Sequence, residues 1–169
     1  MHGDALPDVY GGFGTSLRFY GVDFSIGFTY QLGGQVLDQG YMFYMDSPAG
    51  TSTGNNYHHD LLNSWTPENS GSNIPRFAYN DSNQAAVSDR FLTSASYLNI
   101  QNITLGYTLP KRITRKFLVE NLRIYFACDN VWYWSKRQGL DPRQAINGIT
   151  NPYYYAPIRT FSGGVTVTF

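Results

Sequence analysis

Strict alternation of apolar and polar residues is the dominant pattern of this chain. From Val22 to Leu32, every even position is apolar or aromatic and every odd position is polar or glycine. Successive side chains of a strand point to opposite faces, so this segment predicts a β-strand with one apolar and one polar face. Leu98 and Ile100 are out of phase with the alternation that begins at Ile103, which predicts a β-bulge or a segment beyond the apolar zone. In all, five strands are predicted, at residues 13–20, 22–32, 97–109, 122–134 and 158–169.

The connections between these predicted strands differ greatly in length. Only Tyr20 and Gly21 separate the first two strands, which predicts a tight hairpin. Long loops are expected at about 33–96 and 135–157, whereas a short connection that begins with Pro110 joins the third and fourth strands. In an antiparallel meander, short turns and the carboxyl terminus would then share one end of the sheet and long loops the other. Outer-membrane β-barrels show this asymmetry.

The length and faces of the predicted strands favour a membrane barrel. A tilted transmembrane strand needs about 9–11 residues, whereas strands of globular sheets typically have about 5–6. Aromatic residues lie toward the ends of the apolar faces, as in the interfacial girdles of barrels: Phe19, Phe24, Tyr30, Trp132 and Trp134. The opposite faces are small and polar, which suits a wet or plugged lumen. Five strands cannot close such a barrel, so this interpretation makes the chain one part of a larger unit.

A soluble antiparallel sheet would alternate as well, so a stand-alone β-sandwich remains the alternative. In that case, Trp65 and the run from Tyr153 to Tyr155 would bind a carbohydrate or a protein partner. The amino terminus, Met1 to Asp4, has neither the basic nor the apolar segment of a secretory signal. It therefore favours either a small cytosolic protein or a piece of a longer one.

Composition excludes several other classes of protein. The 169 residues include 12 Lys+Arg and 12 Asp+Glu, and this zero net charge opposes nucleic-acid binding. The single cysteine, Cys128, cannot form an internal disulfide, and we expect it to be a small buried hydrophobic residue on the apolar face. No apolar run is long enough for a transmembrane helix. Gly11 to Gly14 precede a strand rather than a helix, so they do not fit a nucleotide-binding turn. No nucleophile with its base is evident, and no enzyme is predicted.

Several ordered motifs resemble one family. They are Ser88–Leu92, Ser96–Leu98, Asn102–Pro110, Trp65–Asn69, Ile74–Arg76, Tyr30–Gly34, Gly139–Pro142 and the closing segment Gly163–Phe169. Together they resemble the last part of SusC/RagA-type TonB-dependent outer-membrane transporters, from about Pro7 to Phe169. The resemblance implies that residues 1–169 are the carboxyl-terminal part of a receptor barrel. The expected fold is therefore an all-β, antiparallel up-and-down meander of about five strands, within a transmembrane barrel of about 22 strands.

The resemblance also implies a function and partners. Such proteins import large nutrients, glycans or peptides, across the Gram-negative outer membrane, together with a SusD-like surface lipoprotein. The TonB–ExbB–ExbD complex drives them through an amino-terminal region that lies outside this chain. The long loops would be extracellular and the carboxyl terminus periplasmic. The partners expected are outer-membrane lipid, the barrel-assembly machinery and the glycan or peptide substrate, and no cofactor is expected.

Two sets of residues are candidate sites. Gly164, Val167 and the terminal Phe169 resemble the signal that the barrel-assembly machinery recognises, and strand addition at an exposed edge is a plausible way to read it. Exposed aromatics of the long loops can stack on sugar rings or anchor a partner, although they can equally pack the loops together. These candidates are Tyr57, Trp65, Tyr153, Tyr154 and Tyr155.

The polar residues of the long loops do not predict a binding site. Adjacent histidines in an extended segment point to opposite sides, so His58 and His59 beside Asp60 predict a solvated loop rather than a metal site. Asp141 and Arg143 could form a loop ion pair with a structural role, because exposed pairs contribute about 0–1 kcal/mol.

Overall fold

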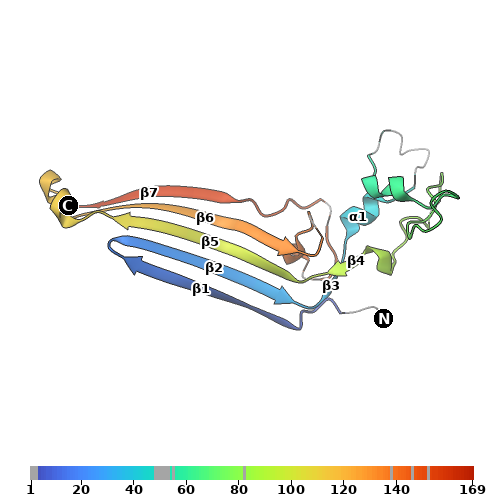
Figure 1. The fold of residues 1–169 in the computed structure, drawn as a ribbon, viewed down its shortest axis with the longest axis horizontal. Helices are drawn as coiled ribbons and strands as arrows, with labels where there is room; N and C mark the ends of the chain where they lie inside the picture. The colour runs from blue at the N-terminus through green and yellow to red at the C-terminus, as the bar shows by residue number, and fades with distance from the viewer. Residues whose placement is uncertain are drawn as a thin grey trace.

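The computed structural model describes residues 4–47, 54, 56–81, 83–137, 139–145, 147–151 and 153–169. Its main element is one antiparallel sheet with the strand order β1-β2-β5-β6-β7 (Figure 1). The strands are β1 (Val9–Phe19), β2 (Val22–Leu32), β5 (Tyr97–Thr108), β6 (Asn121–Ser135) and β7 (Thr160–Thr168). Each strand pairs with its neighbours along the chain in an up-and-down meander. The predicted all-β meander of five strands is therefore confirmed.

The first hairpin closes through a two-residue turn. Tyr20 and Gly21 have φ angles of 47° and 86°, which is the geometry of a type I′ turn. β1 is longer than the alternation indicated, since it begins at Val9 rather than at residue 13. Residues 9–12 pair with β2 through the backbone, and Gly11 lies opposite Tyr30 where its missing side chain leaves room for the ring.

The bulge predicted from the broken alternation lies at Gln101. The register between β2 and β5 shifts between Gly27 and Phe28, which pair with Asn102 and Ile100, so Gln101 is the additional residue of β5. The register between β5 and β6 shifts at the same level. This insertion keeps Ile100 on the same face as Ile103, and the apolar face is therefore continuous across the break in the pattern.

The two ends of the sheet differ, as expected. The short helix α2 (Lys111–Thr114) and the 3₁₀ helix η3 (Arg115–Phe117) join β5 to β6 near the β1–β2 turn and the carboxyl terminus (Figure 1). The long connections lie at the opposite end, where the amino-terminal residues are also found. We call their described residues within 33–96 and 135–157 the loop module.

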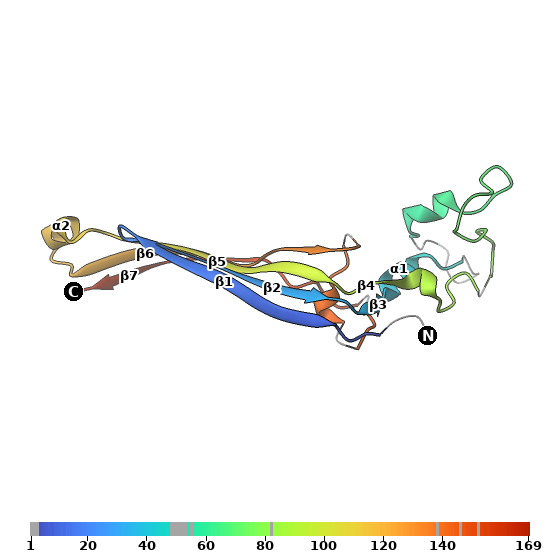
Figure 2. The same cartoon turned by 60° about the horizontal axis from the view of Figure 1, so that its bottom comes forward.

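The loop module contains short regular elements. Strands β3 (Gln35–Leu37) and β4 (Leu92–Ser94) form a two-stranded sheet. The helices are α1 (Gln39–Tyr44), η1 (His59–Asn63), η2 (Asp89–Phe91) and η4 (Pro142–Gln144). Figure 2 shows that α1 and the neighbouring segments lie beyond the ends of the long strands rather than over a face of the sheet.

The hydrophobic core lies in the loop module rather than in the sheet. Leu37, Met45, Leu61 and Phe91 form one buried cluster. A second cluster joins the two long connections, since Val36 and Ala95 of the first pack with Leu140 and Ala145 of the second. Hydrogen bonds from Leu37 N to Gly148 O (2.8 Å) and from Thr150 N to Leu37 O (3.0 Å) add to this contact. The two connections therefore form one packed unit.

The long sheet has no layer packed on either face among the described residues. A β-sandwich needs two sheets packed face to face, and the second sheet here is the short β3–β4 pair at the end of the strands. The architecture therefore does not support the stand-alone sandwich. None of the helices in the described residues is long and apolar enough to span a bilayer.

Candidate functional site

One face of the long sheet is a broad apolar surface. A row across its middle contains Thr15, Ile26, Ile103, Cys128 and Phe161. The next row includes Leu17, Leu105 and Phe126, which are 62%, 49% and 50% exposed. These side chains contact only their neighbours on the same face. The rings of Phe13 and Phe28, for example, stack with centroids 4.8 Å apart. An exposed apolar surface of this extent requires a partner that excludes water.

Tryptophans mark the loop end of this face. Trp132 and Trp134 are 53% and 51% exposed, and they pair across the sheet with Ile100 and Leu98. The guanidinium of Arg159 lies 5.8 Å from the ring centroid of Trp132. A hollow of about 380 Å³ is lined in part by Trp132, Trp134, Arg159 and Pro157. Aromatic side chains at the end of an apolar face, with a cation beside them, are typical of the interfacial girdles of membrane proteins.

The opposite face consists mainly of glycine and small polar side chains, with one ion pair across it. Arg123 of β6 donates from Nε to Oδ1 of Asp23 on β2 at 3.1 Å, and a second bond joins Nη2 to Oδ2. The pair spans β5 above Gly106, where an added Cβ would lie within 2.6 Å of the carboxylate oxygens. Gly106 is therefore glycine because the ion pair occupies its side-chain space. This pair was not predicted from the sequence; its signal was an acidic residue on the polar face of the predicted strand 22–32 and a basic residue on the polar face of the predicted strand 122–134.

Arg143 anchors the second long connection to the polar face of β6. Its guanidinium donates to Asp141 Oδ1 at 2.8 Å through Nε and to Asn130 Oδ1 at 2.7 Å through Nη1. It also lies 4.9 Å from the ring centroid of Tyr133. The hydrogen bond to Asp141 raises the pKa of Arg143 despite its burial. The predicted Asp141–Arg143 pair is thus present, and it fixes the loop on the sheet.

A polar group links α1 to both long connections. Arg137 donates to Asp38 Oδ2 at 3.1 Å and lies 4.1 Å from the ring centroid of Tyr41. The hydroxyl of Tyr41 donates to Asp60 Oδ2 at 2.8 Å. Burial, and then the bond to Asp60, raise the pKa of Tyr41 to about 12. Tyr41 is therefore a hydrogen-bond donor throughout the physiological range of pH.

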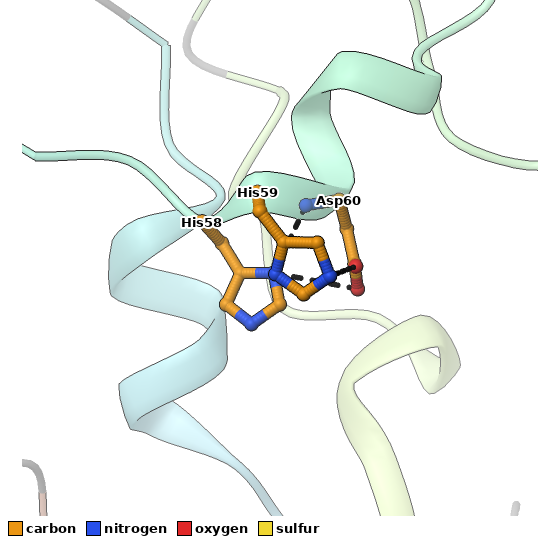
Figure 3. A group of neighbouring side chains, drawn as sticks. All are labelled: His58, His59 and Asp60. Carbon is orange, nitrogen blue, oxygen red and sulfur yellow. Dashed lines mark hydrogen bonds and ion pairs between the residues drawn. The ribbon is translucent and has the colours of Figure 1, made fainter.

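His58, His59 and Asp60 form a compact group at the start of η1 (Figure 3). The expectation that the two histidines point to opposite sides is wrong, because the backbone turns into the 3₁₀ helix at His59 instead of staying extended. Their ring centroids are 4.6 Å apart. Both rings lie beside the Asp60 carboxylate, with His58 Nδ1 3.3 Å from Oδ2 and His59 Nε2 3.0 Å from Oδ1. One potential ligand atom from each residue lies within 4.8 Å of the others.

The aromatic candidates are not brought together into one site. Tyr57 packs beside the Leu37–Phe91 cluster and meets the ring of Phe77, with centroids 5.6 Å apart, so it is mainly part of the packing. Trp65 is 38% exposed, and its backbone N–H donates to Ile74 O at 2.9 Å. Tyr153, Tyr154 and Tyr155 are all strongly exposed. The side chains of these three tyrosines are therefore exposed, as contact residues need to be, whereas Tyr57 is partly buried.

The residues of the predicted assembly signal lie on β7 and just after it. Val167 pairs with Leu122, and Gly164 pairs with Tyr125, whose ring would meet a Cβ at Gly164 within 2.7 Å. Phe169 follows the strand and is 88% exposed. Among the described residues, β7 has a neighbour only on its β6 side. Its other edge presents the unpaired backbone groups that strand addition requires.

The chain is similar in sequence to proteins that are all named TonB-dependent receptors. No family model matches the chain. TonB-dependent receptor P3 of Formosa agariphila is 27% identical in an alignment that covers 99% of this chain and 17% of the receptor. The TonB-dependent receptor SusC of Bacteroides thetaiotaomicron is 28% identical over 164 residues, which cover 96% of this chain and 15% of SusC.

A solved structure gives the same result for the fold. The RagAB peptide importer in its closed-closed state matches with a TM-score of 0.83 and 23% identity, over 100% of this chain and 18% of that chain. The chain thus spans less than a fifth of each of these proteins. The sheet and its loops have the fold of part of a barrel transporter.

Proposed function

This chain is similar over nearly all of its length to TonB-dependent receptors of the SusC and RagA type, as its motifs predicted, and from this premise we propose that it is the carboxyl-terminal wall of an outer-membrane importer. In this proposal the five long strands are part of a closed barrel of about 22 strands. The loop module forms part of the extracellular mouth. The carboxyl terminus lies on the periplasmic side.

The difference between the two sheet faces is the observation that carries this proposal. One face exposes large apolar side chains along the whole sheet, and the other carries glycine, small polar residues and the Asp23–Arg123 pair. A sheet in water would require a second layer over the apolar face. In a membrane, lipid hydrocarbon covers the apolar face, so no second layer of protein is needed. A lumen that holds water or a plug suits the ion pair on the other face.

The outer edges of the sheet support the same conclusion. β1 and β7 each have one neighbour in the described sheet. Backbone groups facing lipid must be hydrogen-bonded, so both strands would pair with further strands of the complete barrel.

The working partners are inferred from the relatives. SusC and the RagAB importer support a SusD-like or RagB-like lipoprotein over the extracellular mouth, and the receptors support coupling to TonB–ExbB–ExbD. The packed loop module offers that lipoprotein a defined surface, because its buried clusters hold the two long connections together. The imported nutrient is a glycan or a peptide. The protein's role is transport rather than catalysis.

The test is fractionation of the complete gene product. We expect it in the outer membrane, and we expect its unboiled form to migrate faster on a denaturing gel than its boiled form, as folded barrels do. Recovery of the native protein in the aqueous fraction would refute the barrel. Loss of growth on one defined glycan or peptide source after deletion of the gene would identify the nutrient class.

A further inference from the structure

The His58–His59–Asp60 group contains a conflict between its hydrogen bonds. The backbone N–H of Asp60 donates to His58 Nδ1 at 3.2 Å, which requires a lone pair on that nitrogen. The same nitrogen lies 3.3 Å from Asp60 Oδ2, also an acceptor. A proton on Nδ1 would satisfy the carboxylate and lose the backbone bond, while an unprotonated Nδ1 leaves two acceptors facing each other. A cation bound by the Nδ1 lone pair and by the carboxylate would remove the contact between these two acceptors, at the cost of the bond from the Asp60 N–H.

The spacing of the donor atoms suits a small ion. Around a tetrahedral ion with bonds of about 2.0–2.2 Å, ligand atoms lie about 3.3–3.6 Å apart. His58 Nδ1 lies 3.3 Å from Asp60 Oδ2, and His59 Nε2 lies 3.0 Å from the other carboxylate oxygen, Oδ1. One donor atom of each residue lies within 4.8 Å of the others, so the set has to contract to reach the tetrahedral separations. The side chain of His59 is 80% exposed, so its ring can adjust to complete the geometry.

Backbone hydrogen bonding and Tyr41 hold two of the three ligands, His58 and Asp60, in place. His58 N donates to Tyr44 O at 2.9 Å, and the His58 ring packs edge-on against Tyr41 at 4.7 Å. Tyr41 donates to Asp60 Oδ2, which orients the carboxylate. Hydrogen-bonded ligands of this kind are the usual support of protein metal sites. Arg137, which lines the same hollow, is already paired with Asp38, so its charge is compensated.

We propose that His58, His59 and Asp60 bind one divalent transition-metal ion of the Zn²⁺ class. Two imidazoles and one carboxylate form a nitrogen-rich set that favours Zn²⁺ over Ca²⁺ or Mg²⁺, which prefer oxygen ligands. A hollow of about 490 Å³ adjoins the group and is lined also by Tyr44 and Leu140. It gives the ion an entry path and space for a further ligand.

The experiment measures Zn²⁺ uptake by the complete protein, purified in detergent and stripped with a chelator. Zn²⁺ alone is titrated in competition with a chromophoric chelator, for the native protein and for His59→Gln. We expect the variant to bind one Zn²⁺ fewer per chain. The control is His2→Gln, which removes the remaining histidine of this chain and should leave the stoichiometry unchanged.

Removal of the hydroxyl that orients Asp60, and competition by Ca²⁺, complete the test. Tyr41→Phe should keep the stoichiometry and weaken the affinity of this site about 10- to 100-fold, because the carboxylate loses its orienting bond. A hundredfold excess of Ca²⁺ should not displace the ion. Because His59 is exposed, His59→Gln should keep the heat-modifiable migration of the native protein. Identical Zn²⁺ stoichiometry and affinity in the native protein and His59→Gln, or displacement by Ca²⁺, would overturn the proposal.

Discussion

Replacing Ile26 with arginine tests which face of the sheet contacts lipid. Ile26 is the fifth of the 11 residues of β2 and lies in the middle row of the apolar face. At about 3.3 Å per residue and a tilt of about 40°, this strand rises about 28 Å along the membrane normal, close to the ~25 Å apolar band of outer-membrane barrels. Ile26 would therefore lie within about one residue of the bilayer midplane.

The expected cost follows from that depth. Arginine at the midplane of a barrel costs about 2–4 kcal/mol, which lowers the ratio of folded to unfolded protein roughly 30- to 700-fold. The matched control is Ser25→Arg, one residue earlier in the same strand and on the opposite face, beside Ser16 and Thr104. Arginine there would point into the polar interior, and we expect a much smaller cost.

The assay is the temperature at which half of the complete protein in outer membranes loses its folded migration on unboiled gels. We expect a clear decrease for Ile26→Arg and little change for Ser25→Arg. Equal decreases for both variants would indicate a sheet buried on two faces. No decrease for Ile26→Arg would show that this face contacts water, and either result would refute the lipid assignment.

Three further variants test other parts of the structure. Phe169→Ala should lower the amount of complete protein in the outer membrane, measured by fractionation; unchanged amounts would remove the assembly signal but not the barrel. Gly106→Ala should break the Asp23–Arg123 pair, because the new methyl group takes the space of the carboxylate, and a crystal structure retaining the pair would contradict this. Phe91→Ala removes a fully buried ring and should destabilise the loop module by about 3–5 kcal/mol, seen as faster hydrogen exchange there than in the strands.

The strands were predictable because their signal is local. Alternation with a period of two needs only neighbouring residues, and the segment 22–32 coincides with β2. The break between Ile100 and Ile103 indicated either a bulge or a segment beyond the apolar zone, and the structure has the bulge, in which one inserted residue reverses the faces. The start of β1 was missed because Gly11 and Gly12 pair through their backbones and carry no side-chain pattern.

The loop module was not predictable in the same way, because its order depends on contacts between distant segments. Val36 packs with Leu140, more than a hundred residues later, and neither neighbourhood shows a regular period. The prediction that His58 and His59 point to opposite sides was wrong for a related reason. Opposite orientations hold for an extended backbone, and the turn into η1 that places both rings beside Asp60 is held by the buried Leu61 and by packing against Tyr41.

The sheet and the loop module therefore depend on different environments. The loop module has buried clusters of its own, whereas the long sheet has few buried side chains and, in the proposed barrel, would contact lipid on one face and neighbouring strands at both edges. Arg143 joins them by binding Asp141 of the loop and Asn130 of β6 with one guanidinium. The bond to Asp141 raises the pKa of Arg143, which favours the charged form of this guanidinium. In the proposed barrel, the extracellular mouth would thus be fixed to the wall by this ion pair and these hydrogen bonds.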